Sequence, residues 1–175
     1  MKKTVFILTF LISFNAWAQG QLQNEATGFI SYTAGKYVQL AEAVPADKYD
    51  WRPESNTRSF AEVFAHTISS NYFFGSQLGA EVPSNINMQS LEKELNTKEK
   101  ILAALKSSFD FAQNAAKAIE DKELATKVSY PFPGEFTNMS SILILMTHTN
   151  EHLGQLIAYA RMNNITPPWS GQGGE

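Results

Sequence analysis

The chain has 175 residues, of which 43% are hydrophobic and 12% aromatic, a composition typical of one globular domain. Its formal net charge of -3 leaves no basic surplus for pairing with phosphates, which argues against nucleic-acid binding. Because cysteine is absent, the sequence excludes disulfides, thiolate nucleophiles and cysteine-ligated metal sites, and three histidines remain as candidate metal ligands or proton carriers.

Residues 1–18 have the three parts of a secretory signal peptide. Lys2 and Lys3 form a basic start, residues 5–14 are almost continuously apolar, and Ala16-Trp17-Ala18 places small residues before a cleavage site. The apolar run is shorter than the about 20 residues that a transmembrane helix needs. We therefore expect cleavage after Ala18 and a periplasmic or secreted protein without a membrane anchor.

Apolar residues at spacings of three and four predict two long helices in the first half of the mature chain. The apolar face of the first helix comprises Leu22, Ala26, Phe29, Thr33, Tyr37, Leu40 and Val44. Pro45 ends this helix, and the loop that follows extends to Thr57. The second helix begins at Ser59, which forms a capping box with Glu62, and reaches about Gly79.

Two further helices are predicted in the second half. The third covers residues 97–119, and the fourth begins with Asn138 as its cap and runs to about Asn163. Residues 142–146 are apolar on every side, which favours a central, buried position for this helix. A glycine inside a helix is unfavourable, so Gly154 indicates close approach of a neighbouring helix.

No segment alternates apolar and polar residues over a sustained length, so no sheet is predicted. Four helices of about 20 residues with apolar stripes predict an all-α protein, a four-helix bundle over residues 19–170. The glycine-rich residues 171–175 are expected to form a disordered tail.

The three histidines form the candidate metal site. His148 and His152 are four residues apart, so their side chains leave the same face of the fourth helix one turn apart. His66 lies midway along the second helix among apolar and small neighbours, which suggests an inward position. Three neutral imidazoles from two helices leave at least one coordination position open, as in catalytic zinc sites. The alternative is that all three are ordinary core or surface histidines.

The segment 148–152 also matches the H-x-x-E-H pattern of inverted zincins, which makes Glu151 a candidate catalytic base. A zincin needs a further acidic ligand on a later helix, and too few residues follow the fourth helix to supply one. This argues against a peptidase, while Glu151 is either a catalytic residue or a surface carboxylate. Gln155 and Tyr159 continue the histidine stripe and either line a pocket or pack in the core.

Taken together, several motifs resemble those of the DinB-like (damage-inducible) metal-binding proteins. They are Trp51-Arg52-Pro53, Ser59 with His66, the run His148-x-x-x-His152-x-Gly154-Gln155-Leu156, Tyr159-x-Arg161, and Pro167-Pro168. The resemblance implies a four-helix bundle with up-down-down-up connections and a divalent metal bound by His66, His148 and His152. Related proteins include thiol transferases, isomerases of the maleylpyruvate type and metal-dependent hydrolases.

Two functional hypotheses follow from this resemblance. The first is a metal-dependent hydrolase or thiol transferase that acts on a small molecule, and export from the cytosol argues against the transferase because low-molecular-weight thiols are scarce outside. The second is a non-catalytic protein of the cell envelope that binds metal or a small ligand. Zinc, nickel, iron and manganese all remain candidates for the ion, and the oligomeric state, with a homodimer as one alternative, is open.

Overall fold

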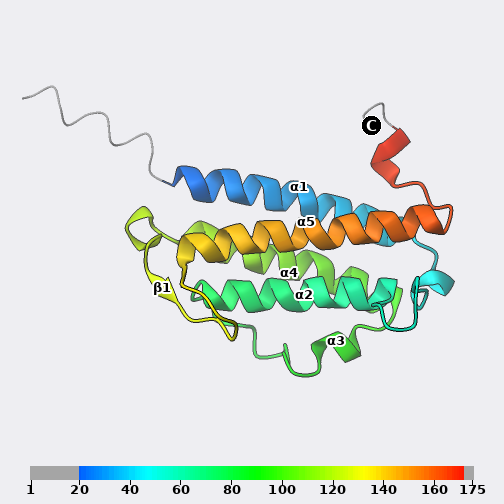
Figure 1. The fold of residues 1–175 in the computed structure, drawn as a ribbon, viewed down its shortest axis with the longest axis horizontal. Helices are drawn as coiled ribbons and strands as arrows, with labels where there is room; N and C mark the ends of the chain where they lie inside the picture. Colours follow the sequence, from blue (N-terminus) through cyan, green and yellow to red (C-terminus); the bar gives the residue numbers. More distant parts are fainter. Residues whose placement is uncertain (1–19, 172–175) are drawn as a thin grey trace, which may run out of the picture.

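The computed structural model describes residues 20–171. Four long helices lie side by side: α1 (Gln21–Ala43), α2 (Phe60–Gln77), α4 (Lys98–Ala118) and α5 (Asn138–Met162). Helices α1 and α5 run in one direction along the molecule, and α2 and α4 run in the opposite direction (Figure 1). Because α1 and α2 each pack against both α4 and α5, the helices enclose one shared core. The mostly helical structure confirms the predicted all-α class.

Short elements connect these helices. A single helical turn, α3 (Leu91–Glu94), lies between α2 and α4, and η1 (Ala46–Lys48), η2 (Asp121–Glu123) and η3 (Pro168–Gly171) are 3₁₀ turns. Strands β1 (Lys127–Val128) and β2 (Phe136–Thr137) pair antiparallel, with Lys127 opposite Thr137. The sequence did not predict α3 or this hairpin, because elements of two to four residues are too short to show a period.

A buried tyrosine joins three of the long helices. The Tyr37 hydroxyl of α1 donates a hydrogen bond to the backbone oxygen of Thr149 in α5 at 2.8 Å and lies 3.2 Å from Thr67 Oγ1 in α2. Burial raises the pKa of Tyr37 above its ordinary value, so the phenol remains a proton donor. This contact fixes α2 and α5, the two histidine-bearing helices, relative to α1.

The helix starts agree in part with the sequence prediction. At the start of α2, the Ser59 backbone N–H donates to the Glu62 carboxylate at 2.8 Å, and the Glu62 N–H donates to Ser59 Oγ at 3.3 Å, as predicted. At the start of α5 the cap is Thr137, with Ser140, and the prediction of Asn138 as cap is wrong. Asn138 is the first helical residue, and its amide instead donates to the backbone oxygen of Glu123 at 3.0 Å.

Two predicted helix faces are also wrong in part. In α1, Phe29 is 58% exposed and Ile30 is buried in its place, because the buried stripe passes from Ala26 to Ile30 with a spacing of four. In α5, Met139 and Leu143 are each 45% exposed. This helix packs against α1 and α2 and is therefore not central, so its remaining side faces solvent.

The close helix contact lies at Gly75, not at Gly154. A Cβ added at Gly154 meets no atom within 4 Å, whereas a Cβ at Gly75 would overlap the Phe111 ring. Glycine at position 75 therefore permits the close packing of α2 against α4. Among residues 20–171, no helix is both long and apolar enough to cross a membrane. The predicted signal peptide and residues 172–175 lie outside the described residues.

Candidate metal centre

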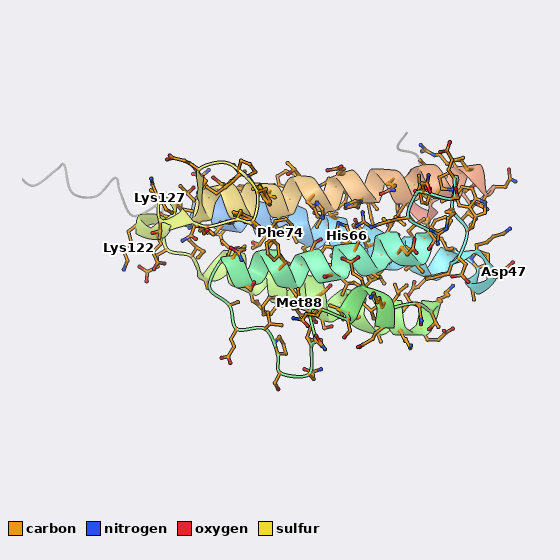
Figure 2. All side chains as sticks on the ribbon, turned by 60° about the horizontal axis from the view of Figure 1, so that its bottom comes forward. Asp47, His66, Phe74, Met88, Lys122 and Lys127 are labelled. Atoms are coloured by element: carbon orange, nitrogen blue, oxygen red, sulfur yellow. The ribbon has the colours of Figure 1, made fainter. Side chains whose placement is uncertain are left out.

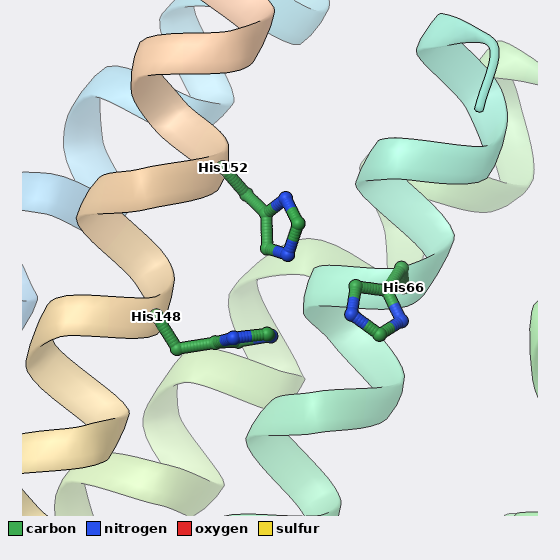
Figure 3. Close-up of side chains that lie close together, drawn as sticks. All are labelled: His66, His148 and His152. Carbon is green, nitrogen blue, oxygen red and sulfur yellow. The ribbon is translucent and has the colours of Figure 1, made fainter. Parts of the chain in front are cut away.

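The structure brings the three histidines together across the interface between α2 and α5. Figure 2 shows His66 midway along α2, far from both ends of the molecule. His148 and His152 extend toward it from successive turns of α5 (Figure 3). One nitrogen of each ring lies within 4.8 Å of those of the other two, and the ring centroids are 4.5–5.2 Å apart. This group can hold a single metal ion.

Two of the three rings are oriented by a side-chain acceptor. The Nδ1–H of His66 donates to Glu92 Oε1 at 3.0 Å, and the Nδ1–H of His152 donates to Gln155 Oε1 at 2.9 Å. When Nδ1 carries the proton, Nε2 holds the free lone pair that a metal ion requires. Such carboxylate–histidine and amide–histidine pairs are typical of metal sites, where they fix the tautomer and the ring orientation.

The third ring, His148, has a different environment. Its Nε2 lies 3.0 Å from Ser70 Oγ, and the Phe74 ring packs against it edge-on with centroids 5.4 Å apart. The hydroxyl of Ser70 rotates freely and both donates and accepts, so this contact permits either tautomer. Each of the three imidazoles therefore has one nitrogen paired with a side chain of the described part of the chain and a second nitrogen left for a ligand.

Burial favours the neutral form of His148 and His152, the state in which an imidazole binds a metal. The pKa of His148 is lowered to about 4, chiefly by burial, and the neighbouring His152 and His66 act in the same direction. Burial also lowers the pKa of His152 below its ordinary value. The hydrogen bond from His66 holds the pKa of Glu92 below its usual range, so this carboxylate is ionised at neutral pH.

A hydrogen-bonded relay connects His152 to the loop before α2. The Gln155 amide donates to the Tyr159 hydroxyl at 2.8 Å, and that hydroxyl donates to the backbone oxygen of Arg58 at 3.0 Å. The Tyr159 ring also packs edge-on against Trp51, with centroids 5.4 Å apart. Gln155 and Tyr159 thus support the candidate centre, and Trp51 of the Trp-Arg-Pro motif holds the relay in position.

The carboxylate nearest the histidines is not the one that the sequence indicated. Glu151 is exposed and lies outside the group of three, although its charge favours the protonated form of His152. Glu92 contacts His66 directly, from the single turn α3. Glu92 could not be predicted from the sequence, because it lies in a segment without periodicity.

Comparison with known proteins identifies the family and a similar fold. The model of the DinB superfamily matches residues 30–156, which is most of the chain. The chain belongs to the DinB superfamily. No curated protein matched the sequence. The crystal structure of a DinB-like protein from Bacillus cereus ATCC 10987 is similar to this DinB superfamily member, with a TM-score of 0.66 and 16% identity over 81% of this chain and 94% of that one. At this identity the likeness shows a shared fold.

Proposed function

We propose that this DinB superfamily member is a metal-dependent enzyme, a hydrolase or transferase acting on a small molecule, whose ion is bound by His66, His148 and His152. The observation that carries the proposal is the convergence of three imidazoles, each with one nitrogen left for a ligand. Three protein ligands leave a position for substrate, as in catalytic zinc sites. A bound ion would supply a Lewis acid and would lower the pKa of a nucleophile beside it.

The residues around the site have separate proposed roles. Glu92 and Gln155 orient His66 and His152, and burial beside Phe74 keeps His148 neutral. Glu151 is proposed as the proton acceptor, because it lies one residue before His152 on the exposed side of α5. The directions of the four long helices, with α1 and α5 opposed to α2 and α4, support the family's up-down-down-up bundle as the scaffold of the site.

Metal content is the first test of this proposal. Purified protein is stripped with a chelator, reconstituted separately with zinc, nickel, iron and manganese, and analysed for bound metal. We expect about one ion per chain in the wild type, since the site offers one set of three ligands. His148→Ala is expected to lose the ion while keeping its helical circular dichroism. Equal metal content in the wild type and His148→Ala would contradict the proposed site.

Catalysis requires a second test. A panel of esters, amides and thiol acceptors is screened with the metal-loaded protein in the presence and absence of chelator. An activity that disappears with chelator, and that falls in Glu151→Gln at unchanged metal content, supports the enzyme. Stoichiometric metal without any chelator-sensitive turnover would instead favour the non-catalytic metal-binding protein of the cell envelope.

We also propose that the protein is exported and processed after Ala18. The basic start, the apolar run and the small residues before the cleavage point support this proposal. Intact mass spectrometry of the protein from the periplasmic fraction tests it, because a processed chain begins at Gln19. A chain that keeps residues 1–18 and stays in the cytosol would overturn the proposal.

A further inference from the structure

A cavity of about 700 Å³ lies beside the candidate metal centre. Its walls are the loop before α2, the first residues of α2 and the turn α3. Glu92 belongs to both features, since it lines the cavity and accepts the hydrogen bond from His66. A molecule in this cavity would therefore lie next to a residue that contacts a proposed metal ligand.

Three cationic side chains line this cavity, and they differ in whether they form an ion pair. Arg52 is engaged, because its guanidinium contacts the Glu62 carboxylate at 3.0 Å and donates to the backbone oxygen of Thr57 at 2.9 Å. Within residues 20–171, no carboxylate lies within ion-pair distance of Arg58 or Lys93, and both are exposed.

Three carboxylates line the cavity beside the three cations, so its lining is balanced in formal charge. Glu62 is paired with Arg52, whereas Glu92 accepts a hydrogen bond from His66 and keeps its charge. Asp50 is the remaining carboxylate of the lining. Within residues 20–171, Arg58 and Lys93 are the cations of this lining without an ion-pair partner.

Arg58 is the cation tied most closely to the histidines. Its backbone oxygen accepts the hydrogen bond from Tyr159 that ends the relay from His152, so its place in the loop is fixed relative to the centre. Its charge also acts on the site, since it lowers the pKa of His148, of His152 and of Glu92. A guanidinium offers a planar pair of donors that matches a carboxylate or a phosphate.

We propose that Arg58 is a substrate-binding residue and that the substrate is a small molecule with a carboxylate or phosphate group. The anionic group binds Arg58 in the cavity, while the reacting end of the same molecule extends toward the three histidines. This inference rests on the proposed metal centre, and it names the class of substrate which that centre would take.

Bifunctional probes test the proposal on the metal-loaded protein. The probes are alkyl hydroxamates, whose hydroxamate binds the ion, in a series of increasing chain length that ends in either a carboxylate or a carboxamide. At the matching length, calorimetry should show about tenfold tighter binding of the carboxylate, as expected for a charge-assisted hydrogen bond. Arg58→Gln should abolish this preference, and Lys93→Gln, the matched control in the same cavity, should retain it. An equal preference in the wild type and Arg58→Gln would overturn the proposal.

A metal-free measurement separates this inference from the proposed function. Phosphate and succinate, at matched ionic strength against chloride, should raise the thermal midpoint of the metal-free wild type and leave that of Arg58→Gln unchanged. If no hydroxamate binds but this anion effect still depends on Arg58, the metal centre fails and the anion site stands. If the anions stabilise both proteins equally, the anion site fails whether or not metal is bound.

Discussion

Glu92 and Gln155 each accept a hydrogen bond from the Nδ1–H of a histidine. In both histidines, Nε2 is then the nitrogen with a free lone pair for an ion. The two acceptors differ in charge. The Glu92 carboxylate places a negative charge beside His66, whereas the Gln155 amide beside His152 is neutral. Beyond the three ligands, Glu92 should therefore contribute most to the affinity for the metal ion.

Replacement of Glu92 by alanine should weaken metal binding by about 10- to 100-fold, the range found when the carboxylate partner of a metal-bound histidine is removed. Competition with a chromophoric chelator measures the affinity. Glu151→Gln is the matched control, because this exposed carboxylate on α5 lies outside the group of three histidines, and its affinity should equal that of the wild type. An unchanged affinity in Glu92→Ala would show that the contact with His66 does not orient a ligand.

At the scale of the elements, α2 determines where both the site and its cavity lie. Its capping box fixes the first turn, which lines the cavity, and His66 follows on the next turns of the same helix. The hydrogen bond from the Ser59 backbone, with a smaller contribution from Arg52, holds the pKa of Glu62 below its ordinary value. The ionised form of Glu62 is thus the form that stabilises this helix start.

This cap predicts a pH dependence of stability. Because the folded pKa of Glu62 is lowered, its contribution is present above the unfolded value of about 4.5 and is lost as the pH falls through the lower folded value. Glu62→Gln keeps an acceptor for the Ser59 N–H but has no charge to lose. Urea unfolding from neutral to acidic pH should show a smaller loss of stability in Glu62→Gln than in the wild type. Parallel pH profiles would contradict this role, and the effect should be modest because Glu62 is exposed.

Replacement of glycine by alanine should have opposite effects at the contact between α2 and α4 and on the open side of α1. Gly75→Ala should destabilise the protein by about 1–3 kcal/mol, because the added methyl group overlaps the Phe111 ring. Gly35→Ala on α1, where the added atom meets open space, should stabilise it by up to about 1 kcal/mol through helix propensity. Denaturant unfolding of both variants measures the difference. Stabilisation by Gly75→Ala would show that α2 and α4 are farther apart than described.

At the scale of the whole molecule, an ion held between α2 and α5 would join two helices from opposite halves of the chain. An ion that binds only the folded state raises the free energy of unfolding by about 2.7 kcal/mol when its free concentration is roughly a hundred times the dissociation constant. Calorimetry should therefore show a higher unfolding temperature with metal than with chelator. In His148→Ala the two temperatures should coincide, and a persistent metal effect in that variant would indicate a different site.

The four long helices and the pairing of His148 with His152 could be predicted from the sequence, because both depend on spacings along a single helix. The spacing of His148 and His152 places both rings on one face whatever the rest of the fold does. Their meeting with His66 depended instead on which helices pack together. The inward position predicted for His66 already suggested this meeting, and the resemblance to a known family implied the same three ligands.

Other features lay beyond what the sequence could predict. Glu92 reaches His66 from a turn of four residues, too short to show a helical period. The choice between Phe29 and Ile30 as the buried residue of α1 was equally hidden, since both are large and apolar and lie one position apart. Only the packing of α1 against its neighbours decides which of the two enters the core.

The distribution of the three histidines over two helices has one more consequence. His148 and His152 lie one turn apart on α5, so a peptide of that helix alone would retain a chelating pair, whereas His66 joins them only in the folded protein. The difference in metal affinity between the isolated peptide and the intact protein would thus measure how much the tertiary structure contributes to metal binding. The centre would then serve as a built-in reporter of native folding.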